Sequence, residues 1–257
     1  MDREWLERWR EYFLAWYDEG SVEEKALEAA EFAKQYLDGG LVSVSGGKDS
    51  MVMLHIIVNK CRSEVDVFHW DHGPALMPRD VENEIINGIS AIAPKAKIIV
   101  KKYSLGGVWR ARVYWRQWYA EFFKTLRELN YRYHLLGVRA EESSRRRARG
   151  RIVERERWVE VHPIYNFTWR DVWAYVFKHN IPVPSIYYLY AKVLGWDKVR
   201  LTTFFDREFE KYGSPQVDNV LAWRWKYVEH SCGYGIKPTS MRQERGGKKE
   251  GKTRAQL

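Results

Sequence analysis

The chain has 257 residues, of which 45% are hydrophobic and 30% are charged, a composition typical of a soluble globular protein with a sizeable core. Lysine and arginine number 43 against 34 acidic residues, and the formal net charge of +9 suits an anionic ligand, a nucleic acid or simply a basic surface. No apolar run is as long as a membrane span, and the charged sequence at 1–13 differs from a secretory signal, so we expect a cytoplasmic protein that does not contact membranes.

Two helices are predicted before residue 39. Apolar and aromatic residues recur at helical spacing over residues 2–19, which predicts an amphipathic helix whose aromatic stripe packs within the chain rather than on a partner. Ser21 followed by Glu24 is a capping-box pattern, and it predicts a second helix that runs to about Leu37. Gly39-Gly40 is expected to end that helix and to lead the chain into a strand.

The sequence LVSVSGGKDS at 41–50 predicts a strand, a tight glycine turn and the start of a helix, because apolar residues at helical spacing follow it. Such a turn directs backbone N–H groups and the positive end of a helix dipole at one point. Glycines let a phosphate approach the backbone closely, while the lysine adds a charge and the serines add hydroxyls. We therefore predict a phosphate-binding loop made of Ser45, Gly46, Gly47, Lys48, Asp49 and Ser50.

A second strand is predicted over residues 65–71, and Gly73-Pro74 ends it. The carboxyl ends of parallel strands line the ligand crevice of an α/β sheet, so Asp71 and His72 are expected near the glycine turn. For His72 we favour a hydrogen-bonded structural role over an acid–base role. The next predicted elements are a helix over 80–92, a strand over 96–103 and a long aromatic helix over 109–129.

A fourth strand is predicted over residues 133–138, and an arginine-rich stretch from 139 to 157 follows it. Planar, always-charged guanidinium groups suit bidentate binding of phosphate or sulfate, although such a run can equally form a solvated hairpin. Thr168 with Asp171 has a capping-box-like spacing and predicts a helix that ends near His179.

The C-terminal quarter of the chain is less informative. Residues 204–227 are predicted to be helical and aromatic, and residues 237–257 are rich in Lys, Arg and Gly without an apolar period, which predicts a mobile basic tail.

The glycine turn matches neither the Walker A loop nor the GxGxxG dinucleotide fingerprint. It resembles the SGGxDS motif of the PP-loop superfamily, the N-type ATP pyrophosphatases, in which the loop holds the phosphates of ATP or the anionic end of an adenylyl sulfate. The run KDSMVMLH at 48–55 is closest to the branch that contains PAPS reductase, the small subunit of ATP sulfurylase and FAD synthetase.

Three further segments share this resemblance. Residues 71–73 resemble a D-T-G segment that borders the nucleotide, with histidine in place of threonine. Residues 137–145 resemble G-x-R-x-x-E-S-x-x-R, which implies that Gly137 lets the nucleotide pack on the strand end and that Arg139 and Arg145 reach phosphate or sulfate oxygens. The stretch from Pro163 to Tyr187 resembles a structural segment of the PAPS reductase branch. The segments follow the family's order over about residues 37–190.

The resemblance implies the fold and its division. We expect a Rossmann-like, doubly wound α/β fold of the adenine nucleotide α-hydrolase-like type, with a mostly parallel sheet and helices on both faces. Residues 1–38 would form an N-terminal helical segment, 39–190 the PP-loop nucleotide-binding domain, and 191–257 a C-terminal helical segment with a basic flexible tail.

The resemblance also implies a reaction, the reduction of phosphoadenylyl or adenylyl sulfate to sulfite. Relatives use a C-terminal cysteine in an E-C-G-L-H stretch, whose thiolate attacks the sulfate sulfur before a thioredoxin-like partner reduces the thiosulfonate. Cys232 within EHSCG is the candidate here, with a buried structural cysteine as the alternative. The chain has only one other cysteine, Cys61, so we expect neither an iron–sulfur cluster nor a cysteine zinc site.

Two other functions remain open. The intact loop also fits an enzyme that cleaves ATP between its α- and β-phosphates and adenylates sulfate, a flavin precursor or a tRNA base. Lys48 would then neutralise charge on the leaving pyrophosphate, with Mg²⁺ bridging the oxygens and Asp49 orienting the metal or the loop. A nucleic-acid-binding module that uses the arginine run and the tail is the third hypothesis. The sequence leaves open whether the protein forms a homo-oligomer.

Overall fold

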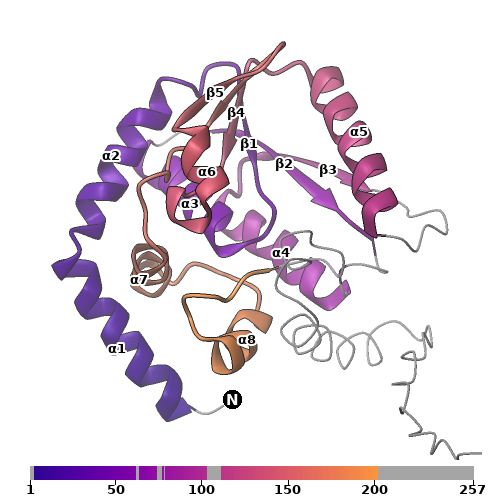
Figure 1. Ribbon diagram of the computed structural model, residues 1–257. Coiled ribbons are helices and arrows are strands. Elements are labelled where there is room, and N and C mark those ends of the chain that lie inside the picture. The colour runs from indigo at the N-terminus through magenta and orange to yellow at the C-terminus, as the bar shows by residue number, and fades with distance from the viewer. Residues whose placement is uncertain (1–2, 62–63, 74–76, 78, 103–110, 202–257) are drawn as a thin grey trace, which may run out of the picture.

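A computed structural model describes residues 3–61, 64–73, 77, 79–102 and 111–201 (Figure 1). Six strands form one sheet in the order β3-β2-β1-β4-β6-β5. Neighbouring strands pair in parallel except for β5, which is antiparallel to β6. The strands are β1 (Gly40–Ser43), β2 (Asp66–Asp71), β3 (Lys97–Lys102), β4 (Tyr133–Leu136), β5 (Ile152–Glu154) and β6 (Val159–Val161).

Helices flank both faces of the sheet. After each parallel strand the chain must return to the end of the sheet where that strand began, and a helix usually makes this crossover. Figure 1 shows α5 on one side and α1, α2 and α7 on the other. The helices are α1 (Arg3–Glu19), α2 (Val22–Lys34), α3 (Lys48–Lys60), α4 (Arg79–Ile92), α5 (Ala111–Leu129), α6 (Ser144–Arg149), α7 (Trp169–His179) and α8 (Ile186–Leu194), with a 3₁₀ turn η1 (Ala140–Glu142) before α6.

The sheet has a hydrophobic core on each face, as the two-residue period of a strand requires. On β1, Val42 belongs to the larger core that includes α1, α2, α3, α4 and α7. The adjacent Leu41 points the other way, into a smaller aromatic core with Phe68 and Trp158 under α5. Because the strand order reverses between β1 and β4, a crevice forms at the carboxyl ends of these strands.

The expected mostly parallel α/β fold with N-terminal helices is confirmed, and element bounds agree to within a few residues. The helix cap expected at Ser21 was wrong. Ser21 has a left-handed backbone with φ of 49° and its side chain makes no cap hydrogen bond, whereas a side-chain N-cap needs an extended backbone. The second helix also ends at Lys34, before Leu37.

The aromatic stripe of α1 packs within the chain, as predicted. Phe13 stacks on Phe177 of α7 with ring centroids 5.4 Å apart. Trp16 Nε1 donates to Asp171 Oδ1 at 3.0 Å, and Lys25 pairs with the other oxygen of this fully buried carboxylate. The same Asp171 completes the predicted capping box with Thr168, so one side chain joins α1, α2 and the start of α7.

The predictions for 204–227 and for the tail fall outside the described residues, and the division at residues 38 and 190 stays a prediction. Within the described part of the chain, no helix has the length and apolarity needed to cross a membrane.

Candidate active site

The loop between β1 and α3 is shaped by one glycine that no other residue could replace without strain. Gly46 has φ of +79°, and a Cβ there would lie 2.5 Å from the side chain of Ile85. The hydroxyl of Ser45 accepts from the N–H of Gly47 at 3.4 Å, and the hydroxyl of Ser50 donates to the Gly47 carbonyl at 2.9 Å. The turn therefore delivers the first turn of α3 to the crevice.

A cavity of about 340 Å³ opens beside this loop at the ends of β1, β2 and β4. One part of its wall is polar and comes from the loop, η1, α6 and the segment after α8. The other part is aromatic and comes from β2 and α5. The lining residues that matter for its chemistry are Ser45, Gly47, Lys48, Asp49, Ser50, Gly137, Glu142, Arg146, Tyr187 and Arg200 on the polar part, and Phe68, Trp70, His72, Trp118 and Phe122 on the aromatic part.

Lys48 is held inside the wall by short contacts. Its ammonium donates to Asp49 Oδ2 at 3.0 Å and to the carbonyl of Val199 at 3.3 Å, and the residue is only 3% exposed. Burial lowers the pKa of Lys48, while the adjacent charge of Asp49 acts in the opposite direction. The backbone N–H of Lys48 donates to the hydroxyl of Tyr187 at 3.0 Å.

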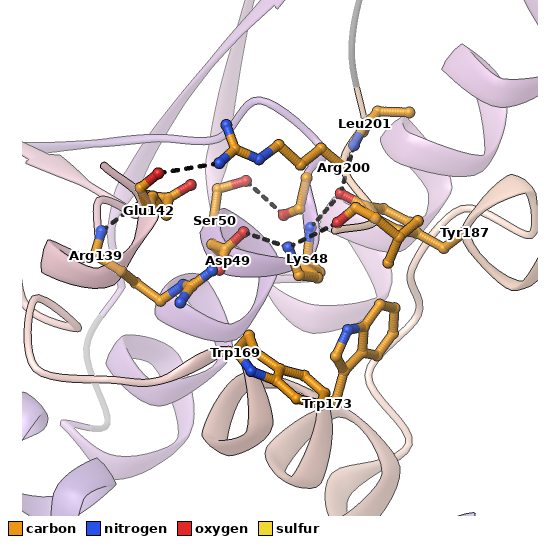
Figure 2. A network of polar contacts seen from close by, with 12 residues as sticks. Lys48, Asp49, Ser50, Arg139, Glu142, Trp169, Trp173, Tyr187, Arg200 and Leu201 are labelled. Atoms are coloured by element: carbon orange, nitrogen blue, oxygen red, sulfur yellow. Dashed lines mark hydrogen bonds and ion pairs between the residues drawn. The ribbon is translucent and has the colours of Figure 1, made fainter. Parts of the chain in front are cut away.

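Asp49 pairs both with this lysine and with Arg139, and Figure 2 shows it between the two. Arg139 Nε donates to Asp49 Oδ1, and its Nη1 donates to Glu141 at 2.9 Å. Burial by itself would raise the pKa of Asp49, but the charges of Arg139 and Lys48 outweigh it and hold that pKa below its usual range. Arg139 thus stabilises the loop through its ion pair with Asp49 and is not among the residues that line the cavity.

The arginine that reaches the cavity from α6 is Arg146, whereas Arg145 is exposed on the outside of this short helix. Arg146 also pairs with Glu142 on η1. Successive helical positions point in directions about 100° apart, so choosing between neighbours required the orientation of α6. Arg200 also lines the cavity, and nothing in the local pattern after α8 marked it as a site residue.

Asp71 lies at the end of β2 as expected, but its carboxylate has other partners there. Both of its oxygens accept from Arg79 at 2.9 Å, and one accepts from the N–H of Gly73 at 2.8 Å. Burial would raise the pKa of Asp71, and these hydrogen bonds lower it by more. The neighbouring His72 is the residue that lines the cavity, with its ring centroid 5.6 Å from that of Trp118.

A family model, the phosphoadenosine phosphosulfate reductase domain, matches residues 40–196. The chain belongs to this family. The match runs from the first residue of β1 past the end of α8, so it contains the loop, Gly137 and all three arginines at 139, 145 and 146. The resemblance inferred from the motifs is thereby confirmed at the level of the PAPS reductase family.

Similar proteins include adenosine 5′-phosphosulfate reductases of two bacilli. The one from Bacillus cytotoxicus is 27% identical over 242 residues, which are 88% of this chain and 97% of the relative. The one from Bacillus cereus strain B4264 is 26% identical over 209 residues, 76% of this chain and 87% of the relative. A crystal structure of phosphoadenylyl-sulfate reductase from Candida auris, a phosphate complex, superposes with a TM-score of 0.52 at 16% identity, covering 68% of this chain and 90% of that one. At that identity the likeness shows the fold.

Arg200 and Cys232 both lie beyond the matched region. Arg200 and Leu201 line the cavity and follow Trp196, where the family match ends. Cys232, the predicted nucleophile, lies outside the described residues. The other cysteine, Cys61, follows α3 at its far end, and its thiol donates to the carbonyl of Ala30 at 3.4 Å.

Proposed function

We propose that this protein reduces an adenylyl sulfate, adenosine 5′-phosphosulfate or its 3′-phosphorylated form, to sulfite. The observation that carries the proposal is the pairing, in one cavity, of the phosphate-type loop at Ser45–Ser50 with an aromatic wall. The family match and the relatives named adenosine 5′-phosphosulfate reductase, one of them matched over 97% of its length, support the same substrate class.

The two parts of the cavity suit the two ends of such a substrate. Backbone N–H groups at the start of α3 and the arginines at 146 and 200 would hold the phosphosulfate anion, because charge-assisted hydrogen bonds to phosphate and sulfate oxygens are strong. The aromatic residues on β2 and α5 offer ring faces and edges on which a purine can stack.

The chemistry we propose uses Cys232 as the nucleophile. Its thiolate attacks the sulfate sulfur, an S–S bond forms, and the S–O bond to the adenosine phosphate breaks with the electron pair leaving on that phosphate. A thioredoxin-like dithiol then attacks the Cys232 sulfur and releases sulfite. The second thiol of the partner resolves the mixed disulfide, so the dithiol supplies both electrons and becomes a disulfide. No iron–sulfur cluster enters this scheme.

The geometry of Lys48 favours this reaction over the adenylation of an acceptor by ATP. Adenylation would use its ammonium to neutralise the leaving pyrophosphate. That ammonium is instead buried and donates to Asp49 and to the carbonyl of Val199, both within the protein. The loop backbone and the cavity arginines therefore carry anion binding in our proposal, and Lys48 shapes the loop.

The test combines a reaction with a matched pair of cysteine variants. Purified protein with thioredoxin, its reductase and either adenylyl sulfate should release sulfite. Cys232→Ser should abolish release, whereas Cys61→Ser should retain it, because Cys61 lies at the far end of α3. Sulfite release that survives in Cys232→Ser would remove the nucleophile, and binding of ATP without binding of either adenylyl sulfate would contradict the reductase.

A further inference from the structure

The segment that follows α8 is tied to the phosphate loop through the hydroxyl of Tyr187 and the ammonium of Lys48 (Figure 2). The oxygen of Tyr187 accepts from the backbone N–H of Lys48 at 3.0 Å and from the backbone N–H of Leu201 at 3.1 Å. The Lys48 ammonium adds a third tie through the Val199 carbonyl at 3.3 Å. Thus the first turn of α3 and the segment 199–201 share partners, although about 150 residues separate them in sequence.

Tyr187 is itself held firmly in place. It is 1% exposed, and its ring meets the ring of Trp173 edge to face with centroids 5.5 Å apart. Trp173 is fully buried and donates from Nε1 to the carbonyl of Trp196 at 3.1 Å. Burial raises the pKa of the Tyr187 hydroxyl, so this group stays a neutral phenol, and the lone pairs of its oxygen accept both N–H groups.

The residue that this arrangement positions is Arg200, which lies between Val199 and Leu201. Its Nη2 donates to the carbonyl of Glu142 at 3.2 Å, and the side chain lines the cavity together with Ser50. Figure 2 shows it extending from beside Tyr187 toward Glu142. The guanidinium therefore joins the two sides of the polar wall beside the loop.

We propose that Arg200 binds the phosphosulfate anion in the loop and that Tyr187 is the positioning residue that keeps Arg200 there. The proposal rests on the proposed adenylyl sulfate site. A guanidinium offers five N–H donors in a plane, so a bond to the Glu142 carbonyl is compatible with further bonds to sulfate or phosphate oxygens. Arg146 reaches the same cavity from α6, and the two arginines supply positive charge from different elements.

The first experiment measures equilibrium binding to the full chain by calorimetry, in a Cys232→Ser background so that substrate is not consumed. Arg200→Ala should weaken the binding of adenosine 5′-phosphosulfate by about tenfold to a hundredfold, the usual effect of losing a charged hydrogen-bond partner. The affinity for adenosine, which lacks the anion, should change by less than about twofold. Arg147→Ala, an exposed arginine on α6, is the matched control and should leave both affinities unchanged.

Equal affinity of the Arg200→Ala protein and its parent for adenosine 5′-phosphosulfate would overturn the role of Arg200. Failure of the parent to bind any adenine nucleotide would overturn this inference and the proposed function together. Normal binding without sulfite release would instead remove only the proposed reaction, and the Arg200 result would stand.

The second experiment tests positioning with Tyr187→Phe, which removes the hydroxyl but keeps the ring. Its control is Tyr188→Phe on the same helix. Tyr187→Phe should weaken the binding of adenosine 5′-phosphosulfate several-fold. Combined with Arg200→Ala, it should cost no more affinity than Arg200→Ala alone, because a residue that acts by positioning Arg200 has nothing left to position once that guanidinium is gone. Losses that multiply in the double variant would overturn the positioning role, and thermal unfolding of each variant verifies that the fold is retained.

Discussion

Gly137, at the end of β4, lies directly against the backbone of Ser50 in the first turn of α3. A Cβ at Gly137 would lie 2.7 Å from both the nitrogen and the Cα of Ser50, and 2.9 Å from the carbonyl carbon of Asp49. These are backbone atoms, which cannot rotate away as a side chain can. The absence of a side chain at 137 therefore sets how closely β4 approaches the loop.

We expect Gly137→Ala to push α3 away from β4, lowering the free energy of unfolding by about 1–3 kcal/mol and weakening nucleotide binding. Gly39→Ala is the control. Gly39 has φ of +70° but only the Arg132 side chain nearby, at 3.8 Å, so alanine there adds strain without a clash and lies at the other end of β1. Denaturant unfolding and calorimetry should show a stability loss in both variants and an affinity loss in Gly137→Ala alone.

The two neighbouring arginines of α6 should behave differently. Arg146→Ala removes a guanidinium from the cavity wall and should weaken the binding of adenosine 5′-phosphosulfate about tenfold or more. Arg145→Ala removes an exposed side chain and should change the affinity by less than about twofold. The reverse order of effects would restore the role that the family resemblance gives to Arg145.

Lys48→Ala should reduce both stability and nucleotide affinity. The substitution leaves Asp49 with one cationic partner fewer in a buried place, which costs about 3 kcal/mol of unfolding free energy by analogy with other buried pairs. Lys95→Ala breaks an exposed pair with Glu64 and should cost less than about 1 kcal/mol. Unaltered nucleotide affinity in Lys48→Ala would speak against the loop as the anion site.

Asp71→Asn separates a structural role from a binding role. Because the carboxylate holds Arg79 and the N–H of Gly73, we expect a loss of about 1–2 kcal/mol in unfolding free energy and little change in nucleotide affinity. Chemical denaturation and calorimetry on the same preparation measure both. A large loss of affinity with unchanged stability would show instead that Asp71 borders the nucleotide, as the D-T-G resemblance implies.

Stability should fall on acidification because of His134 on β4, which is 1% exposed beside the ring of Trp158. Burial lowers its pKa to about 4, against the opposing charge of Glu160. This histidine takes up a proton near pH 6.5 in the unfolded chain and only near pH 4 in the folded protein, so its contribution to the unfolding free energy decreases as pH falls through this window and is constant above it. His134→Gln should flatten the dependence by up to about 1.4 kcal/mol per pH unit, measured by denaturant unfolding at pH 7, 6 and 5. An unchanged slope would contradict a neutral buried histidine.

Much of the architecture could be predicted from local patterns. The run at 41–58 has a β-branched strand, a glycine turn and helical spacing in immediate succession, and each of these is a property of neighbouring residues. The Thr168–Asp171 cap succeeded for the same reason. The cap predicted at Ser21 was wrong because the backbone there, between two packed helices, is left-handed. Tertiary packing set this conformation, and the residue pattern did not reveal it.

Local sequence patterns were enough to predict an α/β protein of the PAPS reductase family with a phosphate-type loop at residues 45–50. Which charged groups face the cavity depends on how distant elements pack together. Arg139 and Asp71 form ion pairs and are not among the lining residues, while Arg146, which pairs with Glu142, and Arg200 line the wall. A buried charged side chain needs a partner of opposite charge, and the partner that Asp49 contributes to Arg139 comes from a distant element, so local spacing does not reveal it.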